Sequence, residues 1–190
     1  VTTNLEHEAV TVPLSEFARM SGRVTTVAAD AEGLVTADDI GAALEADTVA
    51  VSVIAVQNEI GTLQPIADIG RLCKERGVLF HTDAAQAAGK IPLDVNRDGV
   101  DLLSLSAHKM HGPLGVGALY VRRRDPLVTL APQVLGGGQE RGLRSGTLNV
   151  PGIAGLGEAC RIAAVELETE AERLLELRNR LWNRLREELE

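Results

Sequence analysis

Positive charge, long apolar segments, cysteine and lysine are all scarce in this sequence of 190 residues. Asp and Glu together number 27 against 19 Lys and Arg, which gives a formal net charge of −8. Nucleic acids and anionic membrane surfaces attract proteins with a surplus of positive charge, so we expect neither nucleic acid nor membrane as a partner. No segment approaches the roughly 20 consecutive apolar residues of a membrane span, and no basic segment followed by an apolar one suggests a secretory signal.

The two cysteines, Cys73 and Cys160, are too few for a disulfide framework. Such sparse cysteine is typical of a reducing compartment, and we expect the cytoplasm. Both cysteines lie on the apolar faces of predicted helices, as inert core thiols do. Lysine occurs only at Lys74, Lys90 and Lys109, against sixteen arginines. Because the sequence begins with Val and not with Met, we interpret it as a piece of a longer protein.

Short β-branched runs alternate with amphipathic segments as far as residue 146. At 45% apolar and 24% charged residues, the composition is that of a globular domain with one sizeable core. Thr36 precedes a predicted helix as in a capping box, Pro65 stands where another helix would begin its first turn, and Gly77 would end that helix. The alternation predicts an α/β fold with a parallel or mixed sheet and right-handed crossovers. The predicted strands are residues 24–28, 49–56, 78–83, 100–105 and 118–121.

After residue 146 the pattern changes to that of one long helix, or two abutting helices, with a polar outer face. Such a helix usually braces a domain or leads into another. Its apolar positions are Ile153, Leu156, Cys160, Ala163, Leu167, Leu174, Leu181, Leu185 and Leu189.

Polar clusters follow three of the predicted strands, at residues 57–61, 81–86 and 104–109. A fourth cluster is the glycine-rich loop 136–147. In open α/β sheets ligands bind beyond the carboxyl ends of the strands. We therefore expect the functional site where these clusters meet.

Lys109 is the first candidate for chemistry. Most lysines are solvated surface residues. This lysine, however, follows a strand and precedes a loop rich in Gly and Pro, so its backbone is held tightly. A nucleophilic or Schiff-base role is therefore a fair hypothesis. Ser106 and His108 lie beside Lys109 and, together with it, offer three donors suited to a phosphate.

Asp83 ends an apolar strand, where a carboxylate is shielded from water. It has two nearly equal interpretations: the N-cap of a helix over residues 84–88, or the counter-charge of a cationic ring nitrogen. Gln86 and Asn58 are each suited either to capping or to bonding a ligand oxygen. His7, taken alone, is more typical of a surface residue than of a ring-stacking one.

Several other functions are not supported by the sequence. Residues 115–117 belong to no complete dinucleotide fingerprint, and no phosphate loop of the Gly-Lys-Ser/Thr type occurs. His81 with Asp83, or His108 with His111, lacks a third clustered ligand, so we expect no metal site. The arginine run 122–124 is interpreted as a solvated strand end.

Together the clusters resemble the cysteine desulfurases of the NifS/IscS-like group, which are pyridoxal 5′-phosphate (PLP) enzymes of aminotransferase class V and fold type I. Residues 106–109 with their Gly/Pro-rich sequel resemble the motif of the cofactor lysine, and residues 58–61, 81–86 and 137–147 match in order and spacing. The resemblance covers essentially the whole chain.

It implies a three-layer αβα fold with a mostly parallel central sheet, an incomplete large domain of a PLP-dependent transferase, followed by a long C-terminal helix. Residues 1–150 would be the PLP-binding core, and residues 151–190 a helix leading toward a small domain outside the sequence.

The resemblance also implies roles for single residues at the cofactor. Lys109 would form the Schiff base with PLP, and Ser106 and His108 would bind its phosphate. Asp83 would pair with the protonated ring nitrogen and keep the ring an electron sink.

Three further side chains would surround the same ring, and one would act across a subunit boundary. Asn58 and Gln86 would hydrogen-bond around the ring hydroxyl, and His7 would stack on the ring. Thr147 would reach the phosphate held by a neighbouring subunit, which implies a homodimer.

The implied reaction removes sulfur from L-cysteine and gives L-alanine and an enzyme persulfide, with Lys109 and His7 as catalytic residues. The sulfur would pass to an acceptor protein such as an iron–sulfur scaffold. In the family, the persulfide cysteine lies beyond the long helix, and neither Cys73 nor Cys160 matches its position. The alternatives are another class V enzyme, such as a selenocysteine lyase, and a non-catalytic cofactor-binding fragment.

Overall fold

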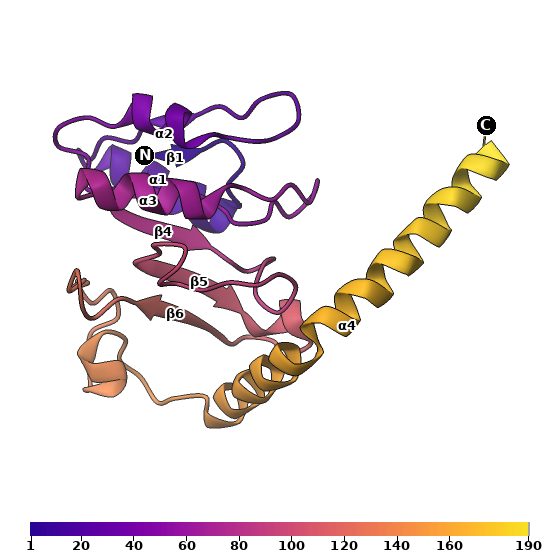
Figure 1. Ribbon diagram of the computed structural model, residues 1–190. Coiled ribbons are helices and arrows are strands. Elements are labelled where there is room, and N and C mark those ends of the chain that lie inside the picture. Colours follow the sequence, from indigo (N-terminus) through magenta and orange to yellow (C-terminus); the bar gives the residue numbers. More distant parts are fainter. Residues whose placement is uncertain (190) are drawn as a thin grey trace.

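A six-stranded sheet forms the centre of the computed structural model, which describes residues 1–189 (Figure 1). The strands lie in the order β2-β1-β3-β4-β5-β6, and all neighbours are parallel except β5 and β6. The predicted α/β fold with a mostly parallel sheet is therefore confirmed. The strands are β1 (Thr2–Thr3), β2 (Thr26–Val27), β3 (Ala50–Ser52), β4 (Leu79–Asp83), β5 (Leu102–Ser106) and β6 (Gly117–Val121).

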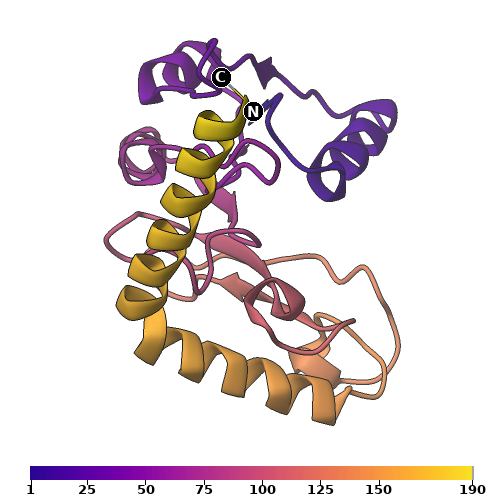
Figure 2. The same cartoon turned by 90° about the vertical axis from the view of Figure 1, so that its right-hand side faces the viewer.

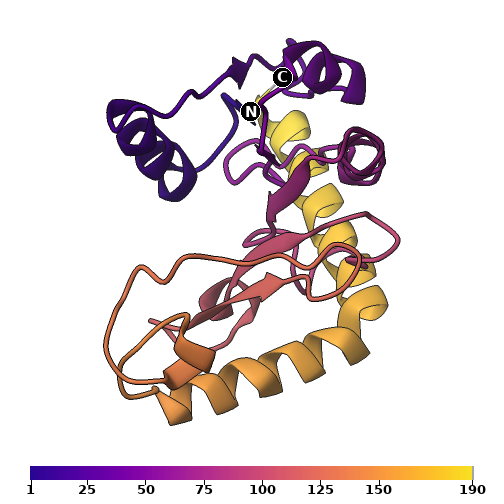
Figure 3. The ribbon, with the colours of Figure 1, turned by 90° about the vertical axis from the view of Figure 1, so that its left-hand side faces the viewer.

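Helices lie on both sides of this sheet. α2 and α3 lie on one side and α1 on the other, as the views along the strands show (Figures 2 and 3). The predicted long C-terminal helix is confirmed as α4, which is bent and whose second half extends away from the sheet (Figure 1). The helices are α1 (Glu8–Arg19), α2 (Ala37–Ala43), α3 (Ile66–Arg76) and α4 (Val150–Leu189), with short 3₁₀ turns η1 (Ala107–Met110) and η2 (Gln139–Gly142).

The main core lies between the sheet and the helices α2 and α3. Phe80 of β4 and Ile69 of α3 are fully buried in it. α3 also approaches the loop that precedes β5 so closely that a Cβ on Gly70 would lie 2.0 Å from the carbonyl oxygen of Asp98. A second, smaller cluster joins α4 to η1 through Leu156, Ala159 and Met110, among others. This packing fixes the backbone beneath the carboxyl ends of β4 and β5.

The predicted helix ends are mostly correct. Thr36 and Asp39 form a complete capping box at the start of α2. Gly77 ends α3 in the left-handed conformation that favours glycine. Pro65 occupies the N-cap of α3 and not its first turn.

Residues 84–88, for which a helix was one interpretation, form no helix, and residues 85–90 form turns. In place of a helix cap, Asp83 Oδ1 accepts a hydrogen bond from the backbone N–H of Ala85 at 2.9 Å.

Arg122 corrects one expectation, because it is not part of a solvated strand end. Its Nε lies 2.9 Å from Asp101 Oδ1, and the two side chains are only 12% and 10% exposed. The guanidinium also donates to the backbone carbonyl of Val100, while Asp101 accepts the backbone N–H of Phe80. The local sequence around Arg122 does not reveal this ion pair, because Asp101 lies 21 residues earlier in the chain, directly before the neighbouring strand β5.

The prediction of a buried core thiol is correct for one cysteine and wrong for the other. Cys73 is fully buried, and burial raises the pKa of its thiol to about 12, so the predicted inert core thiol is confirmed. The prediction for Cys160 is wrong, because this residue is exposed. The buried residues of α4, Gly152, Leu156 and Ala159, all precede Cys160, so the helix leaves the core there. Within residues 1–189, no helix has the combination of length and apolar content needed to cross a membrane.

Candidate functional site

The polar clusters meet at the carboxyl edge of the sheet, because β1, β3, β4 and β5 are parallel neighbours. Asp83 is the last residue of β4 and Ser106 the last of β5. The Cα atoms of Asp83 and Ser104 are register partners, so the ends of these two strands lie side by side. His108 and Lys109 follow at once in η1.

Asp83 is a buried carboxylate at this edge, only 7% exposed. Its Oδ1 accepts the Ala85 N–H, and no described residue donates a hydrogen bond to its second oxygen or forms an ion pair with it. A buried carboxylate is costly without a cation or sufficient donors. The side chain is therefore suited to a ligand that brings a positively charged N–H group.

Lys109 lies exposed on η1, immediately beyond β5. The turn that carries it is tight: the Gly112 N–H bonds the Ala107 carbonyl at 2.9 Å, and a Cβ on Gly112 would lie 2.9 Å from Ala107. The positive charge of Lys109 affects a second lysine, Lys90. Burial, and then the charge of Lys109, lower the pKa of Lys90. Two amines thus share this part of the edge.

Gln86 contacts one of these two amines, that of Lys90. Its Oε1 accepts a hydrogen bond from Lys90 Nζ at 2.7 Å, which leaves its amide nitrogen available to donate to a ligand. Ser106 is half-buried and His108 is exposed beside Lys109. The structure therefore brings Asp83, Gln86 and the residues of η1 to neighbouring strand ends.

The other predicted residues lie on loops around this edge. His7 is exposed and caps α1, with Nδ1 accepting the Ala9 N–H at 3.1 Å. Asn58 is exposed in the loop after β3. Thr147 is exposed in the loop before α4, and within residues 1–189 no hydrogen bond or ion pair links it to Asp83 or Lys109.

Two further titratable residues lie at this edge: Glu6, which was not a candidate from the sequence, and His81, which was considered there only as a metal ligand. Glu6 is 9% exposed, and burial first, with a contribution from the charge of Asp83, raises its pKa to about 7. His81 lies between Ser52 and Ser104, with its Nδ1 2.8 Å from one hydroxyl and its Nε2 3.3 Å from the other. Burial lowers the pKa of His81, against the effect of Asp83. His81 lies in the matched segment 81–86, whereas no pattern in the sequence marked Glu6.

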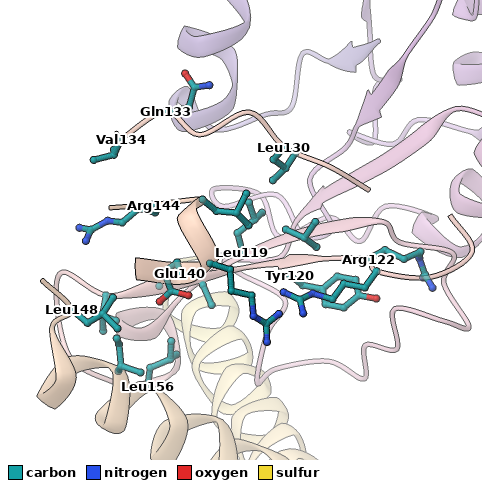
Figure 4. Close-up of a pocket in the computed structure, with 18 of the residues that line it drawn as sticks. Leu119, Tyr120, Arg122, Leu130, Gln133, Val134, Glu140, Arg144, Leu148 and Leu156 are labelled. Carbon is teal, nitrogen blue, oxygen red and sulfur yellow. The ribbon is translucent and has the colours of Figure 1, made fainter. Parts of the chain in front are cut away.

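A cavity of about 1160 Å³ lies elsewhere, along β6, η2 and the start of α4. Figure 4 shows residues that line it, among them Leu119 and Tyr120 of β6, Arg122 just after this strand, and Leu156 of α4. None of the eight predicted site residues lines it. This cavity is therefore distinct from the edge where the candidate residues gather.

The sheet order and the long helix, with a buried carboxylate after one strand and a lysine after the next, define the large domain of a PLP-dependent transferase fold. The chain belongs to the aminotransferase class-V family, whose sequence model matches residues 1–189.

Sequence relatives refine this assignment. The chain is 48% identical over 187 residues to proteins named cysteine desulfurase IscS from Proteus mirabilis (strain HI4320) and from Salmonella newport (strain SL254). In both cases the match covers 98% of this chain and 46% of the relative. The chain thus spans about half the length of the curated relatives it matches.

Solved structures agree with the sequence relatives. A NifS-like protein superposes with a TM-score of 0.92 at 42% identity, over 98% of this chain and 51% of that one. DndA from Streptomyces lividans gives 0.90 at 37% identity, over 97% and 52%. SspA in complex with cysteine gives 0.80 at 43% identity, over 84% and 46%. The resemblance to the NifS/IscS-like group is confirmed.

Proposed function

We propose that this chain is the cofactor-binding part of a PLP-dependent cysteine desulfurase. One observation carries the proposal: a buried carboxylate without a cation, Asp83, and a lysine, Lys109, lie at the ends of adjacent strands. The similarity to proteins named cysteine desulfurase, and to SspA in complex with cysteine, supports L-cysteine as the substrate.

The residues at the sheet edge fit PLP. The second oxygen of Asp83 would accept the N–H of a protonated ring nitrogen, and Lys109 would bind the aldehyde carbon. Ser106 and His108 would bind the phosphate. When bound, PLP supplies an electron sink that withdraws charge from the substrate carbon next to it.

The remaining predicted side chains would orient that ring and its substrate. His7, held by its bond to the Ala9 N–H, would cover one face of the ring. Gln86 would donate its amide N–H, since its oxygen is taken by Lys90, and Asn58 would bond near the ring hydroxyl. Lys109, once displaced by the substrate amine, would move protons at the substrate carbon.

Neither Cys73 nor Cys160 matches the position of the family's persulfide cysteine, so we propose that another thiolate takes the sulfur. Cys73 is fully buried with a pKa raised to about 12, so it is a poor nucleophile at neutral pH. We propose a persulfide on a cysteine outside these residues and transfer to an acceptor protein such as an iron–sulfur scaffold. We also propose a cytoplasmic homodimer in which Thr147 contacts the partner's cofactor.

Borohydride reduction tests the central role of Lys109. The purified protein is incubated with PLP, reduced, digested and analysed by mass spectrometry, alongside Lys109→Ala and a control, Lys74→Ala, in an exposed residue of α3. We expect the label on Lys109 in the wild type and in the control, and none in Lys109→Ala. A label on Lys74 or Lys90 in Lys109→Ala would refute the assignment.

Turnover separates the proposal from its alternatives. The turnover assays use the full-length protein, because the proposed persulfide cysteine lies outside these residues. We expect that protein to release alanine from cysteine, and its Lys109→Ala variant to lose this activity. Faster turnover of selenocysteine than of cysteine would indicate a selenocysteine lyase. Cofactor binding without release of alanine from either amino acid would indicate a non-catalytic module.

A further inference from the structure

Glu6 occupies the point where the short strand β1 leaves the sheet. β1 pairs with β3 through Thr2 and Ser52, and the chain then turns away from the sheet. The continuation of β3 stays paired with β4 on its other side, since the N–H groups of Val53 and Ala55 donate to β4 carbonyls. The N–H of Ile54 between them faces the side that β1 has left.

The Glu6 side chain supplies the acceptor that the backbone of β1 no longer offers. Its Oε1 accepts the Ile54 N–H at 2.8 Å and the Thr3 hydroxyl at 2.8 Å. Ile54 is 2% exposed and Thr3 is fully buried, so neither donor has water as a substitute. A buried donor without a partner costs about 1–3 kcal/mol. Glu6 is therefore a brace between the β1–α1 loop and the end of β3.

The brace joins two sides of the candidate site. His7 follows Glu6 directly and caps α1, so the position of Glu6 determines where the His7 backbone, and with it the His7 ring, lies at the site. On the other side, Ala55 follows Ile54, and its N–H donates to the carbonyl of Asp83 at 2.9 Å. The Thr3–Glu6–Ile54 contacts thus connect the backbone of His7 to that of Asp83.

The second oxygen of Glu6 indicates its protonation. Oε2 is buried and has no hydrogen-bond partner among the described residues. An ionised carboxylate with one buried oxygen that no donor reaches is costly, whereas the neutral carboxylic acid avoids the buried charge. No described cation pairs with Glu6, and the charge that acts on it is that of Asp83, which also acts on His81. The raised pKa of Glu6 agrees with this geometry.

We propose that Glu6 is a positioning residue of the site, which holds His7 and Asp83 in register through the backbone of β3 and carries a proton, so that Asp83 bears the negative charge of the pair. The part of this proposal that concerns PLP rests on the proposed function. The brace itself does not, because it exists without a ligand.

Cofactor binding tests the positioning role. Dissociation constants for PLP are measured by absorbance for Glu6→Ala, Glu6→Gln and the control Glu8→Ala, which alters an exposed neighbour. Gln keeps the acceptor oxygen, so we expect Glu6→Gln to bind within about threefold of wild type and Glu6→Ala about tenfold more weakly or worse. Binding by Glu6→Ala equal to that of Glu8→Ala would overturn the positioning role.

The pH dependence of the bound cofactor tests the proton. We expect the visible spectrum of the wild type to change between about pH 6 and about pH 8, and that of Glu6→Gln to stay constant over this range. Thr3→Val should move the transition upward, since the Thr3 hydroxyl lowers the pKa of Glu6. Thr2→Val, which removes a buried hydroxyl without a partner, should leave it in place. A transition that survives in Glu6→Gln would place the proton elsewhere.

Hydrogen exchange separates failure of the brace from failure of the proposed function. In cofactor-free protein, we expect the Ile54 amide to exchange about tenfold faster or more in Glu6→Ala than in Glu8→Ala. If Glu6→Ala does not fold, Thr3→Val against Thr2→Val gives the same comparison. Unchanged exchange at Ile54 would refute the brace, whereas faster exchange in a protein that binds no PLP would refute only the proposed function.

Discussion

Replacing Glu6 by glutamine should change how the stability of the cofactor-free protein depends on pH. The pKa of Glu6 is about 7 in the folded chain, against an ordinary value of 4.5. Burial is the main cause, the charge of Asp83 adds to it, and the bonds from Ile54 and Thr3 oppose it. The side-chain amide of the Glu6→Gln variant cannot titrate, but it retains an acceptor oxygen for the same two donors.

The sign follows from proton binding. Between the two pKa values the folded chain holds a proton on Glu6 that the unfolded chain has lost, so the free energy of unfolding falls as pH rises. The fall begins near the unfolded value of 4.5 and is complete above about 7. A change of this size corresponds to about 3 kcal/mol, because each pKa unit is worth about 1.4 kcal/mol.

Urea unfolding of wild type and Glu6→Gln at several values from about pH 4 to about pH 8 measures this effect. We expect the stability of the wild type, relative to the variant, to fall by about 3 kcal/mol over that range. Other titrating groups cancel in the difference. The control Glu59→Gln, in an exposed loop, should show a difference that stays within about 0.5 kcal/mol. A difference that is flat, or that rises with pH, would refute the proton on Glu6.

Two structural predictions concern the frame that holds the site. Arg122→Met leaves Asp101 buried without its cation, so unfolding should become easier by about 3–5 kcal/mol, whereas Arg123→Met, in the exposed neighbour, should cost less than about 0.5 kcal/mol. Thermal unfolding checks both, and equal stabilities would contradict the importance of the ion pair. Gly70→Ala should cost about 1–3 kcal/mol or more, because its Cβ would meet the Asp98 carbonyl at 2.0 Å; an unchanged urea midpoint would show that the loop yields freely.

The sequence predicted the carboxyl edge of the sheet well, for a physical reason. Asp83 and Lys109 each follow a strand with enough apolar residues to be recognised, and parallel strands place such ends side by side. Local signals also found helix ends, as at Thr36 and Gly77, since capping involves residues only a few positions apart. What lies within one turn or one strand is readable from the pattern.

Contacts between distant segments were not readable in the same way. Arg122 looked solvated because Asp101, which pairs with it, lies 21 residues earlier in the chain, directly before β5. Cys160 looked buried because its helical face is apolar, yet α4 leaves the core after Ala159. In both cases the local pattern was real, and the tertiary packing decided the outcome.

Glu6 could not be predicted from the sequence, because neither a local pattern nor a nearby partner marks it. The strand order explains its role. β1 is only two residues long and carries two threonines, so no periodicity marks it as a strand. Its place between β2 and β3 nevertheless brings Glu6 to Ile54, 48 residues later in the chain. Had β1 been longer, its own backbone would have paired with Ile54 and no side chain would have been needed. The shortness of β1 therefore places a protonated carboxyl group next to Asp83, where the charge of the site is set.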